Sequence, residues 1–212
     1  MNYPNMLLVG STARNTGKTT FCLAFLEKWG KSFDIVAVKV STVAKEGALC
    51  HHGDFGCGAC SSFSGKYEIS VETDPTGKKD TNLLLNAGAS KVFWIRTLKS
   101  SALEAFESIM GKLPESSIIL CESNVLFEFI TPGLAVLMHR SGIENVKQSS
   151  ELFREKADFI CDISQPHAIE DVLRNVNVSQ NGIIYRALTG GVCTPTDFGP
   201  RYDSPPVEAG DL

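Results

Sequence analysis

The 212-residue chain lacks several features that mark common functional classes. Lysine and arginine form no basic run and the net charge is −4, which argues against a nucleic-acid partner and against binding to an acidic membrane surface. No apolar run approaches the ~20 residues needed to cross a bilayer, and no charged, apolar leader follows Met1. We therefore expect a cytoplasmic protein that binds neither nucleic acid nor membrane.

The sequence also lacks internal repeats and any boundary between two domains. A chain of this length buries a full core without disulfides or metals. We expect one domain over residues 1–192, followed by an extended or disordered tail over 193–212, where prolines are frequent and apolar periodicity is weak.

Nothing in the sequence indicates export, so its seven cysteines are not expected to form disulfides. Three of them lie within apolar helix or strand patterns, namely Cys22, Cys121 and Cys161. Such positions are typical of buried, unreactive thiols.

Apolar runs alternate with helical patterns along most of the chain. Strands are expected at residues 6–10, 33–40, 91–96, 117–121, 134–138, 157–163 and within 181–190. Helices are expected at residues 17–30, 80–88, 101–113, 150–156 and 166–176. This alternation predicts an α/β fold of three layers, with helices on both faces of a mostly parallel sheet. Residues 41–79 form a long Cys/His-rich insertion after the second strand, and so long an irregular segment is usually functional.

Local signals mark three of the expected helix starts. Ser101 and Glu104 have the spacing of a capping box. Asp80 is expected to cap the next helix upstream, and Pro166 suits a first helical position.

Residues 6–20 run from an apolar strand through a small, polar loop into an amphipathic helix. The loop fits the phosphate-binding pattern G-x-x-x-x-G-K-[ST] except at its first position, which is Thr12. Gly17 would let the backbone approach a phosphate, Lys18 would supply charge for the outer phosphates, and Thr19 would offer a hydroxyl to Mg²⁺. The predicted nucleotide-binding residues of the loop are Asn15, Thr16, Gly17, Lys18, Thr19 and Thr20.

Because Thr12 replaces the first glycine, the turn out of the strand is expected to rely on Gly10. Ser11, Thr12 and Asn15 are expected to support it through local side-chain hydrogen bonds. The alternative is an ordinary strand-to-helix turn with a surface lysine.

Further candidates follow other strands, since ligands of open parallel sheets collect at the carboxyl ends of the strands. Lys39 ends the second expected strand, and Glu122 follows an apolar strand in the manner of a Walker B acid. Glu122 would hold Mg²⁺ directly or through water; the alternative is a solvated carboxylate. Asp162 closes the sixth strand, but no guanine-reading Asn-Lys-x-Asp motif follows it.

A second cluster of chemistry-bearing residues lies in the insertion. Cys57 and Cys60 form a C-x-x-C pair, and Cys50, His51 and His52 precede it closely. Three thiolates and one imidazole would complete a tetrahedral zinc shell, whereas three thiolates alone would suit an iron–sulfur cluster or a site shared across a dimer. The alternatives are a flexible loop with thiols and a redox-active C-x-x-C.

Residues 1–165 loosely resemble the B-type proteins of molybdopterin-guanine dinucleotide biosynthesis. The resemblance rests on residues 17–20, the strand ending at Lys39, residues 79–89 and the strand leading to Glu122. Those proteins are small GTP-binding adaptors that assist the transferase attaching GMP to molybdopterin. The resemblance implies a P-loop NTPase that binds nucleotide through residues 17–20, with Asp80 and Glu122 near the site.

Two other families offer alternatives. The loop also resembles that of dethiobiotin synthetases and cobyrinic acid amidases, which use ATP to activate a carboxyl or carbamate, although no glutaminase domain is present. Nucleotide-dependent metal-insertion proteins would account for both the loop and the cysteines. We expect a homodimeric, slow NTPase that uses Mg²⁺ with GTP or ATP, acts through Lys18, Glu122 and Asp80, and serves a cofactor-biosynthesis or metalloenzyme partner. Asp54 and Asp80 are the candidates for orienting water.

Overall fold

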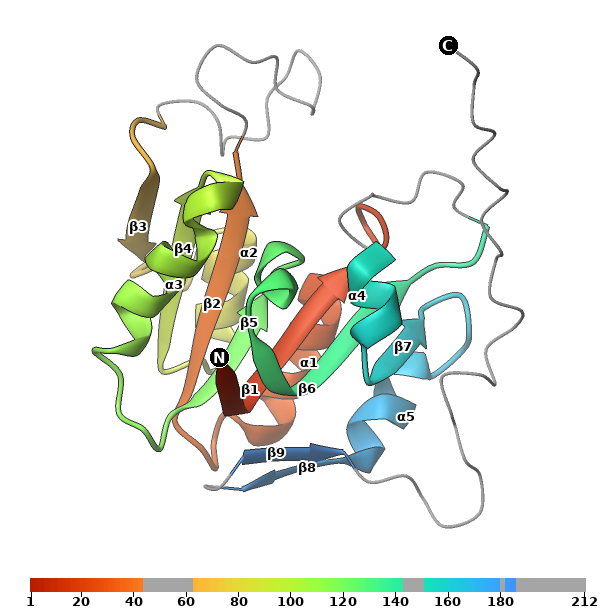
Figure 1. Cartoon of the computed structure of the whole chain (residues 1–212). Helices are drawn as coiled ribbons and strands as arrows, with labels where there is room; N and C mark the ends of the chain where they lie inside the picture. The colour runs from red at the N-terminus through yellow and green to blue at the C-terminus, as the bar shows by residue number, and fades with distance from the viewer. Residues whose placement is uncertain (44–62, 143–150, 180–181, 186–212) are drawn as a thin grey trace, which may run out of the picture.

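The computed structural model describes residues 1–43, 63–142, 151–179 and 182–185. Its main sheet contains β1 (Asn2–Ser11), β2 (Ile35–Thr42), β3 (Tyr67–Val71), β4 (Lys91–Thr97), β5 (Ile118–Glu122), β6 (Thr131–His139) and β7 (Phe159–Asp162). The strand order is β3-β4-β2-β5-β1-β6-β7 (Figure 1). Only β3 runs antiparallel to its neighbour, so the expected α/β fold with a mostly parallel sheet is confirmed.

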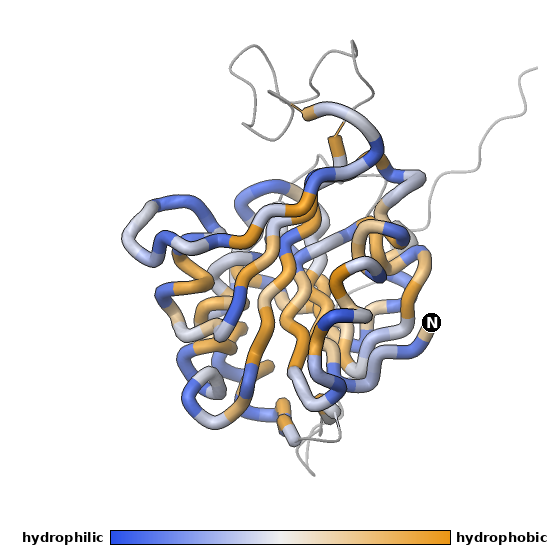
Figure 2. The backbone as a smooth tube through the Cα atoms, turned by 90° about the vertical axis from the view of Figure 1, so that its left-hand side faces the viewer, coloured by the Kyte–Doolittle hydropathy of each residue, from blue (hydrophilic) through white to orange (hydrophobic). Residues whose placement is uncertain are grey.

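Helices cover both faces of this sheet (Figure 1). One face packs against α1 (Lys18–Trp29), α2 (Asp80–Asn86) and α5 (Ala168–Asn175). The other packs against α3 (Ala102–Met110), α4 (Glu151–Lys156) and the 3₁₀ turn η2 (Val125–Glu128). The middle parts of the central strands are apolar (Figure 2) because alternate residues pack on opposite faces of the sheet: Leu7 and Val9 of β1 lie in the first core, and Met6 and Leu8 lie in the second.

A separate two-stranded antiparallel sheet, β8 (Val176–Ser179) and β9 (Gly182–Tyr185), lies at the opposite end of the molecule from the tip of β2 (Figure 1). The expected strand within 181–190 is β9, whereas β8 was not expected. Val176 was placed on a helix face, but α5 ends at Asn175. Val176 and Val178 alternate with polar residues and are buried, which is the two-residue period of a strand.

The three expected helix starts were wrong in detail. The 3₁₀ turn η1 (Lys99–Ser101) precedes α3, so Ser101 is already wound and makes no side-chain cap, and α3 ends at Met110. Asp80 is the first residue of α2, after Lys79. Pro166 lies before α5, which begins at Ala168.

The segment expected to be irregular, residues 41–79, contains the end of β2 and all of β3. Its cysteine-rich part and the tail over 193–212 lie outside the described residues. No helix in the described ranges is long and apolar enough to cross a membrane.

Candidate functional site

The loop between β1 and α1 leads into the first turn of α1 at the carboxyl edge of the sheet. Gly17 adopts φ 82°, a left-handed conformation that favours glycine, and Asn15 does so at φ 55°. The first helical hydrogen bond runs from Phe21 N to Gly17 O over 2.9 Å, and no side chain caps α1. The N–H groups of the first turn are therefore available to an anion.

The turn after β5 and the end of β6 hold the start of this loop. Ser11 N donates to Asn124 Oδ1 at 2.9 Å, and Asn124 Nδ2 donates back to Ser11 O at 2.7 Å. Thr12 N donates to Met138 O at 3.0 Å, and Thr12 Oγ1 lies 3.1 Å from His139 Nδ1. The backbone leaving β1 is thus fixed on both sides.

The expected role of Gly10 was wrong. Gly10 lies inside β1, and a Cβ atom there would come within 2.3 Å of the Phe153 ring in α4. Glycine is needed at this position for helix packing, not for a turn. Within the loop, Thr16 Oγ1 donates to Ala13 O at 3.1 Å, and Ser11 Oγ accepts a hydrogen bond from Lys18 Nζ at 2.8 Å.

A buried carboxylate faces the loop between β1 and α1 from the end of β5. Glu122 is 7% exposed, and its Oε1 lies 3.1 Å from Lys39 Nζ and 3.9 Å from Lys18 Nζ. Thr19 Oγ1 donates to Glu122 Oε2 at 3.5 Å. Strand register explains the convergence, because Val9 of β1 pairs with Glu122, which pairs in turn with Lys39 of β2.

The two lysines have different environments. Lys39 also bonds Asp80, at the start of α2; burial alone would lower its pKa, but Glu122 and Asp80 outweigh burial and raise it. Burial lowers the pKa of Lys18, and the attraction of Glu122, which raises that pKa, is too weak to offset the effect of burial. Lys18 Nζ donates a hydrogen bond to the neutral Ser11 Oγ, with 2.8 Å between the two atoms. Lys18 is therefore the cation that gains more from an arriving anion.

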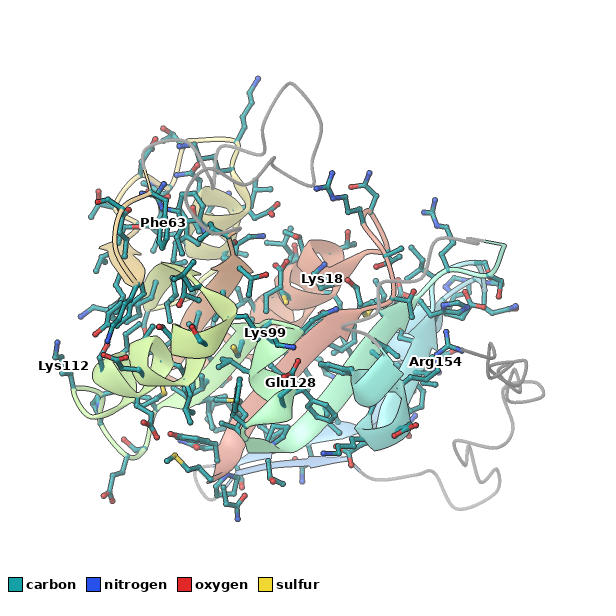
Figure 3. All side chains as sticks on the ribbon, turned by 45° about the horizontal axis from the view of Figure 1, so that its top comes forward. Lys18, Phe63, Lys99, Lys112, Glu128 and Arg154 are labelled. Atoms are coloured by element: carbon teal, nitrogen blue, oxygen red, sulfur yellow. The ribbon has the colours of Figure 1, made fainter. Side chains whose placement is uncertain are left out.

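These residues line an open cleft of about 1710 Å³. The predicted loop residues, Lys39, Asp80 and Glu122 all contribute to it. Lys18 and the Lys99–Glu128 ion pair, which Figure 3 labels, all line this cleft. The described lining includes three acidic side chains and these basic ones: Arg14, Lys18, Lys39, Lys78, Lys79, Arg96, Lys99 and Arg140. The excess of positive charge favours an anionic ligand.

Asp162 does not join the cleft. Its carboxylate accepts hydrogen bonds from the backbone and hydroxyl groups of Ser141 and Ser164. Burial opposes its ionisation, but these hydrogen bonds prevail and lower its pKa to about 2. Asp162 therefore organises the loops after β6 and β7.

Cys22, Cys121 and Cys161 are buried, as expected. Burial raises the pKa of all three, that of Cys161 to about 12, so they remain thiols at neutral pH.

The predicted metal ligands of the insertion, Cys50, His51, Cys57 and Cys60, lie outside the described residues, as do His52 and Asp54. Within the described ranges, no group of three or more His, Cys, Asp or Glu side chains is arranged to hold a metal. The zinc or iron–sulfur site stays a prediction.

Sequence reasoning missed Asn124 and His139, which anchor the loop. Each is a polar residue just after or at the end of an apolar strand beside β1, and that position was the available signal. Comparisons with protein-family models, curated proteins and solved structures found no match. The described residues define an α/β protein with a basic cleft at the carboxyl edge of its sheet.

Proposed function

We propose that this chain is a P-loop NTPase that binds Mg²⁺ with GTP or ATP and hydrolyses the nucleotide slowly. One arrangement carries the proposal: the uncapped first turn of α1 presents Lys18, and the buried Glu122 carboxylate faces Thr19 beside it. A helix N-terminus and a lysine together bind the outer phosphates of a nucleotide.

In this mechanism, Lys18 exchanges the Ser11 hydroxyl for a phosphate oxygen, which removes a neutral partner and provides a charged one. The backbone N–H groups of residues 17–20 hold the phosphates in place. Because the lysine and the helix terminus are in position before binding, they stabilise the charge that develops during phosphoryl transfer.

The residues present also fit Mg²⁺. Glu122 Oε2 and Thr19 Oγ1 lie 3.5 Å apart, and both are oxygen donors of the type Mg²⁺ prefers. These two side chains would hold the ion, which when bound neutralises charge on the outer phosphates. Lys18 Nζ and Lys39 Nζ lie 3.9 Å and 3.1 Å from Glu122 Oε1 and hold this carboxylate at the site by ion pairing.

Slow hydrolysis follows from the acidic residues available. Asp80 was expected to act in catalysis, but it is ion-paired with Lys39, which also binds Glu122. Asp80 and Glu122 are thus both engaged by one lysine, which limits their access to an attacking water. Asp80 also positions Lys39, and its catalytic role stays a prediction. A protein partner that completes the site would raise the rate.

The sequence resemblance supports a pathway for this activity. We propose that the NTPase is a homodimeric adaptor in molybdopterin-guanine dinucleotide biosynthesis or in related metallocentre assembly. The predicted cysteine ligands support the second setting, and their metal content distinguishes the two.

The test is calorimetric titration with GTP and with ATP in the presence of Mg²⁺. Lys18→Ala should weaken binding by about a hundredfold, because it removes the charged contact with the phosphates. Lys31→Ala, at an exposed position in the turn just beyond the end of α1, is the matched control and should bind as the wild type does. Equal affinity in wild type and Lys18→Ala for both nucleotides would refute the proposal.

A further inference from the structure

The floor of the cleft continues beyond the phosphate loop along one row of paired residues. Glu122 of β5 pairs with Lys39 of β2, Lys39 pairs with Trp94 of β4, and Trp94 pairs with Ser70 of β3. Residues paired in this way share one face of the sheet. At about 4.8 Å per strand, Trp94 lies about 10 Å from Glu122, two strands away.

The Trp94 indole is held in a fixed position on this floor. Its Nε1 donates to Ser41 Oγ at 3.0 Å, and the Arg96 guanidinium carbon lies 5.2 Å from the ring centroid. Arg96 is in turn ion-paired with Glu68 of β3. Half-buried and lining the cleft, the ring is a preorganised apolar platform.

The cleft is larger than one small ligand requires. Its volume of about 1710 Å³ exceeds the ~300–1,000 Å³ typical of a pocket for a single small molecule. A nucleotide bound by α1 occupies the end near Lys18. Trp94 and the exposed side chains of Lys78, Lys79 and Lys99 line the cleft as well. Lys39, the strand partner of Trp94, bonds Asp80, the residue after Lys79, so the start of α2 lies at the Trp94 end of the cleft. Lys99 is ion-paired with Glu128, which leaves Lys78 and Lys79 as the main cationic contribution there.

We infer that this end of the cleft, formed by Ser41, Lys78, Lys79, Trp94 and Arg96 and here named the Trp94 subsite, binds a second ligand: a planar organic anion. The ring of the ligand packs on Trp94, and its phosphate or carboxylate faces Lys79 and Lys78. The inference rests on the proposed function only in that a nucleotide occupies the end of the cleft near Lys18. The planar anion would then be a co-substrate that lies next to the outer phosphates of that nucleotide.

Tryptophan fluorescence tests the subsite directly, because the chain contains two tryptophans. In a Trp29→Phe variant, Trp94 is the sole emitter. The probe is 4-nitrophenyl phosphate, a planar anion whose nitro group quenches indole on contact, added after Mg²⁺ and a non-hydrolysable nucleoside triphosphate have filled the phosphate loop. Uncharged 4-nitrobenzyl alcohol and inorganic phosphate serve as comparison ligands. Calorimetry with the wild-type chain repeats the titration without the tryptophan change.

We expect saturable quenching by 4-nitrophenyl phosphate, weakened about tenfold by Lys79→Glu because a repulsive charge replaces an attractive one. Lys112→Glu, an exposed lysine beyond α3 (Figure 3), is the matched control and should leave the titration unchanged. Absence of saturation, equal quenching by the alcohol, or equal affinity in Lys79→Glu would overturn the subsite. Quenching that occurs only in a parallel titration without nucleotide would also overturn it, because the probe would then have occupied the phosphate loop. Saturable quenching in a chain that binds no nucleotide would refute the NTPase proposal and leave the subsite standing.

Discussion

The buried ion pair between Lys39 and Glu122 should stabilise the fold as well as shape the site. The two side chains are 18% and 8% exposed, and Lys39 Nζ lies 3.1 Å from Glu122 Oε1. The perturbations are Lys39→Met, Glu122→Gln and the double variant, which keep side-chain volume nearly constant and remove charge.

The expected magnitude follows from the geometry. At 3.1 Å the attraction is about 5 kcal/mol for an effective dielectric constant of about 20. Removal of one partner of a buried pair costs about 3–5 kcal/mol. Here each partner keeps a second ion, Lys18 at 3.9 Å for Glu122 and Asp80 for Lys39, so each single variant should lose about 2 kcal/mol. The double variant should lose little more than either single one, which gives a coupling energy of about 2 kcal/mol.

The assay is urea unfolding followed by circular dichroism, with an unchanged m-value as the check that unfolding stays two-state. The pair formed by Lys99 and Glu128 offers a matched control, because these side chains are 63% and 25% exposed. The same cycle there should give a coupling energy below about 0.5 kcal/mol. If the Lys39–Glu122 coupling is no larger than that of the control pair, the account of a buried charge network at this site is wrong.

Three further outcomes can be measured with the same unfolding assay. Gly10→Ala should destabilise the protein by about 2 kcal/mol, since its Cβ would lie 2.3 Å from the Phe153 ring; a neutral effect would contradict the packing. The pKa of Asp162, lowered to about 2 by hydrogen bonds, means that its stabilisation is complete above about pH 4 and is lost as the pH falls toward about 2. Asp162→Asn should lose about 1 kcal/mol after allowance for solvent screening, and its stability should fall less over that range; an unchanged pH profile would show that Asp162 does not contribute. Thr12→Gly should lower the free energy of unfolding by about 1–2 kcal/mol, because glycine has more backbone freedom to lose on folding and the contact with His139 is removed. Equal stability in the variant and the wild type would show that this contact is unimportant.

The strand pattern predicted the sheet because apolar runs of this kind are buried on both faces. The runs ending near Lys39 and Glu122 became neighbouring strands, and their polar ends met at one edge. The rule that ligands of open parallel sheets bind at the carboxyl ends of the strands was enough to predict that the two residues share one site.

What could not be predicted depends on contacts between distant parts of the chain. Trp94 was assigned only to a strand, because its pairing with Lys39 is set by strand order. Gly10 was assigned to a turn, because the ring of Phe153 that excludes a side chain comes from α4. Ser101 failed as a cap since the chain had already begun to wind at Lys99.

The loop between β1 and α1 departs from the phosphate-binding sequence pattern at Thr12, and this departure has a structural explanation. Outside glycine, the described residues with positive φ are Asn15 and His167, so the backbone at Thr12 needs no glycine. The left-handed positions of the loop are Asn15 and Gly17, and asparagine tolerates this conformation better than most residues. Thr12 instead joins the loop to β6 through His139. The first position therefore anchors the loop, whereas the start of α1, where Gly17 and Lys18 match the pattern, keeps a left-handed glycine and a first turn without a side-chain cap. The proposed phosphate binding requires only this second part of the loop.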